Sequence, residues 1–151
     1  HSNAFDSLEN LEILDLSNNL IKILYSNTFK NLLYLNYLNL EKNQLIYLEN
    51  DLFRNLTSLN NLILNGNYLK EISNLTFFYL NNLKTIDFEN NRLINLNNGL
   101  KLPKSIKNVK LSNNFYLNTI DFIKNESYSL SSFYLKNISL EAILSIGLNK
   151  M

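Results

Sequence analysis

Cysteine is absent from this chain of 151 residues, which excludes a disulfide scaffold, a thiolate metal site and a cysteine nucleophile. The single histidine stands at position 1, so histidine is not expected to catalyse a reaction inside the fold. The 14 basic and 13 acidic side chains leave a net charge of +1, which is too small to attract a nucleic acid. No apolar run approaches the ~20 residues of a membrane-spanning helix, so no membrane insertion by this segment is expected.

Turn-forming residues are also scarce, since the chain has only 3 glycines and 1 proline. Two residue types dominate instead, with 33 leucines and 30 asparagines. The apolar fraction of 46% excludes wholesale disorder and suits one domain with a sizeable core. The chain does not begin with Met, and no signal-peptide pattern opens it. We therefore expect a fragment of a longer protein.

An internal repeat of 24 residues organises the chain. The period is marked by equally spaced residues of two types, Phe5, Phe29, Phe53 and Phe77, and Asn19, Asn43, Asn67 and Asn91. The unit reads L-x-x-L-x-L-x-x-N-x-L-x-x-L-x-x-x-x-F-x-x-L, with Ile in some Leu slots. Three consecutive copies between Leu11 and Leu80 fill every fixed slot, so the sequence predicts a solenoid.

We interpret residues 1–151 as a single domain made of consecutive copies of the repeat. It begins with a partial repeat at 1–10, and the following copies are 11–34, 35–58, 59–82, 83–105 and 106–129. The fourth copy is one residue short and lacks the Phe slot. Residues 130–151 fit either a degenerate sixth repeat or a short amphipathic helix from Ile138 to Leu148.

Each fixed slot has a structural interpretation. The alternation Leu14-x-Leu16 and its equivalents predict one short strand per repeat with a single buried face. Buried amides after the strand can pair backbone groups that lack a partner in the sheet. We therefore predict a structural asparagine ladder made of Asn19, Asn43, Asn67, Asn91 and Asn114. The phenylalanine column is expected to lie in the core with the leucines.

This pattern resembles the leucine-rich repeat family, strongly over residues 5–114 and weakly over 115–148. Its period and Phe slot are similar to the typical extracellular subclass, found in Toll-like receptor ectodomains, Slit-like guidance proteins and secreted insect immune proteins. The resemblance implies an α/β solenoid shaped as a horseshoe. One short parallel strand per repeat would line the concave face, and irregular or 3-10 segments would return along the convex face.

The resemblance also implies a non-catalytic binding module rather than an enzyme. It would be a glycoprotein segment of a receptor for innate immunity or signal transduction, at the cell surface or secreted. Its partner would be a protein or peptide ligand, including one derived from a pathogen. An intracellular scaffold with the same fold is the alternative. Solenoid ends without polar caps also predict marginal stability or self-association of this chain alone.

Specificity is expected in the residues that flank the strand leucines, because the rest of the frame is invariant. The candidates are Asp15, Tyr37, Asn39, Glu41, Ile63, Asn65, Thr85, Asp87, Glu89, Lys110 and Tyr134. The first four copies are acidic on this face and the last two are basic. Asp87 and Glu89 form a carboxylate pair, but an open face without a nucleophile does not predict catalysis. Two ligands are also too few for a metal, and no metal or cofactor is expected.

Four glycosylation sequons occur, at Asn55, Asn74, Asn125 and Asn137. With 30 Asn and 19 Ser or Thr, chance alone predicts about four, so their number is no evidence of secretion. Their positions are more informative. Asn55 and Asn74 fall in the return segments, where a glycan would leave the concave face clear.

Overall fold

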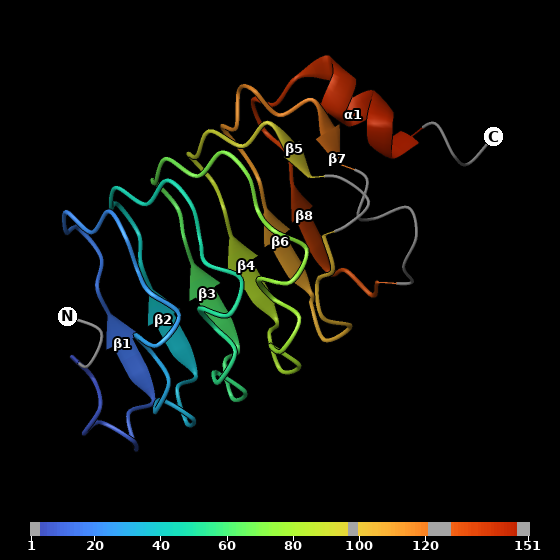
Figure 1. Cartoon of the computed structure of the whole chain (residues 1–151). Coiled ribbons are helices and arrows are strands. Elements are labelled where there is room, and N and C mark those ends of the chain that lie inside the picture. Colours follow the sequence, from blue (N-terminus) through green and yellow to red (C-terminus); the bar gives the residue numbers. More distant parts are fainter. Residues whose placement is uncertain (1–3, 97–99, 121–127, 148–151) are drawn as a thin grey trace.

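The computed structural model describes residues 4–96, 100–120 and 128–147 (Figure 1). Its main sheet has six parallel strands in the order β1-β2-β3-β4-β6-β8. They are β1 (Ile13–Asp15), β2 (Tyr37–Asn39), β3 (Asn61–Ile63), β4 (Thr85–Asp87), β6 (Asn108–Lys110) and β8 (Ser132–Tyr134). A second, two-stranded sheet pairs β5 (Asn95–Leu96) with β7 (Thr119–Ile120), and one helix follows, α1 (Leu140–Gly147).

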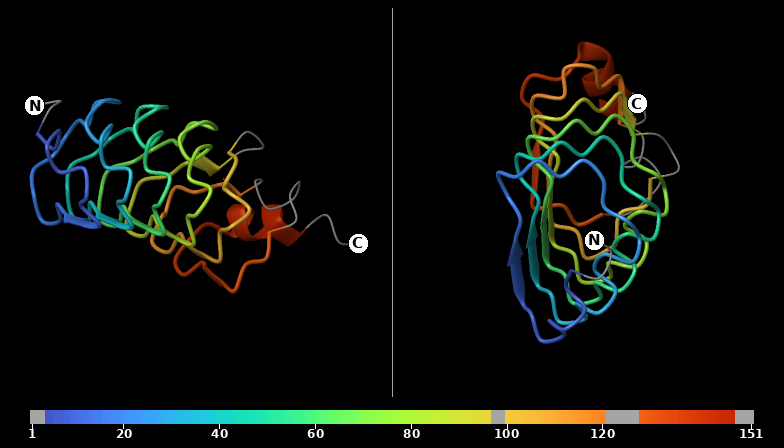
Figure 2. Two further views of the ribbon diagram at one scale, coloured as in Figure 1. Left: turned by 90° about the horizontal axis from the view of Figure 1, so that it is seen from below. Right: turned by 60° about the vertical axis from the view of Figure 1, so that its left-hand side comes forward.

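The strand register follows the sequence repeat. Leu14 faces Leu38, and the same row continues through Leu62 and Ile86 at steps of 24 residues. The next partner of Ile86 is Val109, a step of 23, because the fourth copy is one residue short. The structure thus confirms the predicted parallel-strand solenoid. Figure 2 shows its turns stacked one behind another around a common core.

The return segments are turns rather than regular helices. Backbone N–H groups donate to the carbonyl three residues earlier, for example from Thr28 to Tyr25 and from Leu32 to Phe29. This agrees with the expected irregular returns. The β5–β7 pair on the return side was not predicted, since two-residue strands leave no periodic pattern in the sequence.

The last described segment, residues 128–147, contains a strand followed by a helix. Strand β8 continues the main sheet as a sixth repeat would, and α1 then packs against β7. The helix buries Ala142 and leaves Leu140, Ile143 and Leu144 exposed. At the other end, Leu14 is only half-buried, whereas its equivalent Leu38 is fully buried. The expectation of self-association through the ends stays a prediction.

The core contains a row of stacked phenylalanines. Ring centroids lie 5.9 Å apart between Phe5 and Phe29, 6.3 Å between Phe29 and Phe53, and 6.1 Å between Phe53 and Phe77. The fourth copy has no Phe in this slot. There the ring of Phe88, which follows β4, lies 5.7 Å from that of Phe77 and closes the row from the strand side. Since Phe88 stands where the neighbouring repeats have leucine, the larger side chain fills volume that the missing ring would occupy.

Candidate functional site

The outward side chains of the main sheet form the concave face. Because side chains alternate along a strand, the leucine row points inward and its two neighbours point outward. One outward row is Ile13, Tyr37, Asn61, Thr85, Asn108 and Ser132, and the next is Asp15, Asn39, Ile63, Asp87, Lys110 and Tyr134. The predicted ligand-binding residues of the strands therefore lie side by side across the sheet. Glu41, Asn65 and Glu89 lie two residues beyond the ends of β2, β3 and β4.

An ion pair lies in the centre of this face. The Nζ of Lys110 donates to Asp87 Oδ2 at 3.0 Å, and Asp87 Oδ1 accepts the backbone N–H of Glu89 at 3.0 Å. Both oxygens of the Asp87 carboxylate therefore accept a hydrogen bond. The residue is also only 4% exposed. The hydrogen bond to Asp87 raises the pKa of Lys110, against an opposing effect of burial. The accessible partner of the pair is therefore the lysine.

Two more candidate residues support the backbone at the strand ends. Asp15 Oδ1 accepts the N–H of Ser17 at 2.8 Å, and Asn39 Oδ1 accepts the N–H of Glu41 at 3.0 Å. The hydrogen bonds from Ser17 lower the pKa of Asp15. Each of these short side chains thus closes a turn where the chain leaves the sheet. The sequence pattern predicts only a ligand-binding role for these two residues, whereas the structure also shows these turn-closing hydrogen bonds.

Loss of the central carboxylate should lower the pKa of Lys110. In Asp87→Asn, the amide can still accept from Glu89, but the charged partner of the lysine is gone. Because the pKa of Lys110 is raised, the pair stabilises the folded state fully at pH values below the lysine pKa of the unfolded chain, about 10.4. This stabilisation is lost as the pH rises through the folded value. NMR titration of the lysine side-chain signals measures the shift. Asp51→Asn on the convex face is the control, and an unchanged Lys110 titration in Asp87→Asn would contradict the assignment.

The asparagines of the predicted ladder pair backbone groups between turns. Asn67 Nδ2 donates to the carbonyls of Leu40 at 2.9 Å and Leu64 at 3.0 Å, and its Oδ1 accepts from the N–H of Leu45 at 3.0 Å. The same pattern recurs at Asn43, Asn91 and Asn114. Asn19, in the first turn, donates to carbonyls of its own turn and is exposed.

A second, exposed asparagine ladder was not anticipated. Asn90 Nδ2 donates to Asn65 Oδ1, Asn113 to Asn90, and Asn137 to Asn113, each at 2.8 Å. Asn90, Asn113 and Asn137 have positive φ angles, as does Gly66 in the equivalent position. Asparagine and glycine tolerate this conformation best. The available signal was the Asn or Gly that directly precedes four of the five ladder asparagines, with Lys42 as the exception. The hydrogen bond from Asn90 ties Asn65 to the next turn.

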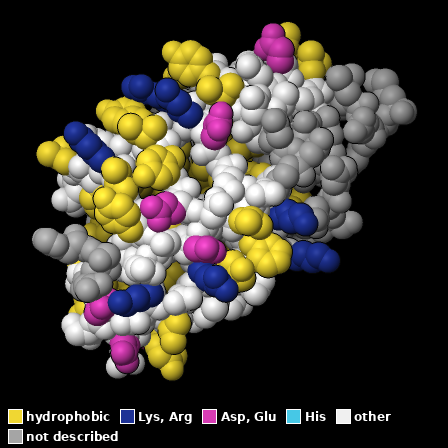
Figure 3. Space-filling model, in the orientation of Figure 1, with side chains coloured by type: hydrophobic (Ala, Val, Ile, Leu, Met, Phe, Trp, Pro, Cys, Tyr) yellow, Lys and Arg dark blue, Asp and Glu magenta, His cyan; other side chains and the backbone are white. Residues whose placement is uncertain are grey.

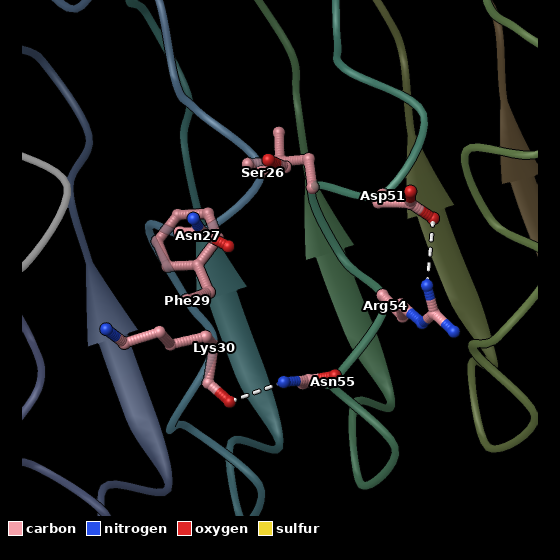
Figure 4. A pocket seen from close by; sticks show the side chains of 8 residues that line it. Ser26, Asn27, Phe29, Lys30, Asp51, Arg54 and Asn55 are labelled. Carbon is pink, nitrogen blue, oxygen red and sulfur yellow. Dashed lines mark hydrogen bonds and ion pairs between the residues drawn. The ribbon is translucent and has the colours of Figure 1, made fainter.

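A polar hollow on the convex face holds one of the sequons (Figure 4). Its volume is about 190 Å³, and Asn55 Nδ2 donates across it to the carbonyl of Lys30 at 2.6 Å. The charges around it are satisfied within the protein, because Lys30 pairs with Asp6 and Arg54 with Asp51. Such internal pairing leaves little to attract a ligand.

Asn74 and Asn137 are exposed, whereas the predicted sequon at Asn125 lies outside the described residues. Within the described ranges, no three His, Cys, Asp or Glu side chains come together as a metal site. Over the same residues, no helix is long and apolar enough to span a membrane.

Comparison with protein-family models gives one match. Residues 1–98 match the model described as "BspA type Leucine rich repeat region", in six copies. This is about two thirds of the chain. No curated protein matches.

Several solved structures share the fold. Toll, in the glycosylated Toll–Spatzle complex from Drosophila, superposes with a TM-score of 0.78 at 22% identity over 92% of this chain. The leucine-rich repeat domains of APL1B and APL1 give TM-scores of 0.73 and 0.71, at 24% and 23% identity over 89% and 92% of this chain. The match covers 20% of the Toll chain, 40% of APL1B and 38% of APL1, so the chain spans only a small part of these proteins.

Proposed function

The chain belongs to the family of BspA-type leucine-rich repeat proteins, and we propose that it is a binding module whose concave face holds a protein or peptide ligand. Repeats of this family are typically non-catalytic. The observation that carries the proposal is the composition of the face. The inward row of each strand is apolar throughout, whereas the outward residues differ from turn to turn and include Tyr37, Ile63 and Tyr134. Apolar and aromatic residues on a polar surface are the kind that anchor protein interfaces.

The charge of the side chains changes from acidic to basic along the solenoid. This change suggests how charges would be distributed along the ligand. Residues 1–51 contain seven acidic and three basic side chains, and residues 101–151 contain three acidic and seven basic ones. On the concave face, Glu41 and Glu89 precede Lys110 and Lys136. A ligand with basic groups over β1 to β4 and acidic groups over β6 and β8 would complement this surface.

Binding can be tested with peptides selected from a random display library on the immobilised chain. Their affinity should fall by about tenfold or more in Ile63→Ser and Tyr134→Ser, which remove apolar anchors. Glu89→Lys should weaken the binding of basic peptides and reduce the salt dependence of that binding. Phe78→Ser, on the convex face, is the matched control. Selected peptides that bind all concave variants as tightly as the original chain would overturn the proposal.

We infer an extracellular setting, as part of a recognition protein of immune-receptor type. This setting is suggested by the fold that the chain shares with Toll, whose complex with Spatzle is described as a molecular hub in development and innate immunity. The convex positions of Asn55 and Asn74 are compatible with it, because glycans there would leave the concave face open. An intracellular scaffold would use the same face without glycans.

Glycan analysis separates the two settings. Asn55 and Asn137 use their Nδ2 atoms in hydrogen bonds to Lys30 and Asn113, whereas Asn74 Nδ2 is not a donor in any bond found among the described residues. Asn74 should therefore be the readiest acceptor of a glycan in the native protein. Mass spectrometry before and after enzymatic deglycosylation measures this, with Asn74→Gln as the control. Native protein without any glycan would favour the intracellular scaffold.

A further inference from the structure

The flank of the solenoid that follows the strands exposes an unusual amount of apolar surface. We define this post-strand flank as residues 20–23, 44–47, 68–71, 92–95 and 115–118. Seven large apolar side chains are exposed on it, Leu20, Ile23, Ile46, Tyr47, Tyr68, Phe115 and Tyr116. In Figure 3, yellow side chains gather along the upper left edge, with dark blue ones between them. Patches of this kind mark interaction sites.

The opposite flank, which precedes the strands, provides an internal comparison. It consists of residues 33–36, 57–60, 81–84 and 104–107, and its exposed large apolar side chains are confined to Leu33 and Tyr34 in the first of these segments. The other exposed positions there are threonine, asparagine and lysine. Both flanks connect the main sheet with the return segments, but exposed large apolar residues recur from turn to turn only on the post-strand flank.

An inserted residue enlarges this apolar surface in the fifth turn. In the first four turns, one residue separates the ladder asparagine from the next core residue, as in Asn91-Arg92-Leu93. In the fifth turn there are two, Phe115 and Tyr116, which form a turn closed by the N–H of Leu117 on the carbonyl of Asn114 at 3.0 Å. Both aromatic side chains project outward and are about two-thirds exposed, at 66% and 65%.

The projecting pair walls a hollow of about 490 Å³. Its other lining residues are Lys70, Arg92, Ile94 and Asn118, so two cations and no carboxylate face the space. The Arg92 guanidinium lies 4.4 Å from the ring centroid of Tyr68, which holds it at the rim. Neither Lys70 nor Arg92 takes part in an ion pair with the described residues. The hollow therefore combines apolar walls with unpaired positive charge.

We propose that this hollow is a second docking site, separate from the concave face, for a partner-protein segment with a carboxylate beside a large apolar side chain. The carboxylate would pair with Arg92 and Lys70, and the apolar group would pack on Phe115 and Tyr116. A protein fits better than a small molecule, because the apolar strip continues along the flank for four turn spacings, roughly 19 Å at ~4.8 Å each. A membrane surface fits less well, because the flank has three cations and Glu71, fewer than the 4–8 clustered basic residues typical of lipid binding.

The test uses an isotope-labelled chain titrated by NMR with the capped peptide Gly-Glu-Phe-Asp-Leu-Glu-Gly. We expect the peptide to change the chemical shifts of the backbone amides of Lys70, Ile94 and Asn118. Arg92→Glu should weaken binding about tenfold, equivalent to about 1.4 kcal/mol. The double variant Phe115→Ser with Tyr116→Ser should weaken it comparably. A second peptide, with Gln and Asn in place of Glu and Asp, should bind the original chain about tenfold more weakly.

Controls come from another hollow, away from the post-strand flank, which also combines an aromatic ring with two cations, Phe78 with Lys101 and Lys104. Phe78→Ser and Lys104→Glu should leave the affinity unchanged, and circular dichroism confirms that each variant is folded. Shifts confined to the concave face, or equal affinity for both peptides, would overturn this proposal without affecting the proposed function. Binding to phosphatidylserine vesicles that is lost in Arg92→Glu, together with no peptide binding, would assign the flank to a membrane instead.

Discussion

Replacing Phe53 with alanine should lower the free energy of unfolding by about 3–5 kcal/mol, the range for removing a buried aromatic ring. Phe53 is fully buried and stacks on Phe29 on one side and on Phe77 on the other. The change therefore leaves a cavity and removes both ring contacts, each worth about 0.5–1.5 kcal/mol beyond burial. Urea denaturation followed by circular dichroism measures the loss.

Phe78→Ala is the matched control for this prediction. Phe78 is 49% exposed and contacts Tyr79 edge to face, so its removal should cost less than about 1.5 kcal/mol. If both variants lost the same stability, the phenylalanine row would not be the structural column described above. A change in the slope of the denaturation curve would indicate that the turns no longer unfold together.

Asn67→Ala should cost about 1–3 kcal/mol, because the substitution leaves buried backbone groups unpaired. The affected groups are the N–H of Leu45 and the carbonyls of Leu40 and Leu64, which belong to two adjacent turns. Asn67→Asp should be no better, since a carboxylate can accept from Leu45 but cannot donate to the two carbonyls. Thermal and urea denaturation of both variants provide the measurement.

Asn50→Ala is a suitable control for the ladder, because Asn50 is an exposed residue in a return segment. Its substitution should change the free energy of unfolding by no more than about 0.5 kcal/mol. If the Asn67→Ala variant were as stable as the original chain, the prediction would be wrong, and water would have to make the hydrogen bonds of the Asn67 amide. Hydrogen exchange at the amide of Leu45 would then show whether the turn had opened.

The repeat made much of the fold predictable. A period of 24 residues specifies one strand per turn, and the alternation Leu14-x-Leu16 specifies which side chains point inward. The shorter fourth copy even predicts the changed step between Ile86 and Val109. These features are visible in the sequence because each turn contacts mainly its neighbours and meets the same environment, so the same residue types recur.

The candidate site could be predicted only in part. Sequence periodicity placed Asp87 and Lys110 on one face, but it did not show that they are adjacent partners or that Asp87 is almost fully buried. It also left the exposed ladder from Asn65 to Asn137 unseen, because the fixed slots of the unit do not include those positions. The contacts between outward side chains depend on how neighbouring turns are aligned with one another in the structure.

The sequence by itself determined the solenoid, the inward leucines and phenylalanines, and the position of the buried asparagines, because burial imposes similar residue types at the same place in the regular turns. Tertiary structure decided how the non-repeating residues combine. It brought Lys110 onto Asp87, and it placed Phe115 and Tyr116 beside Arg92 and Lys70. Such contacts join residues more than 20 positions apart, and no repeat constrains which side chains occupy them.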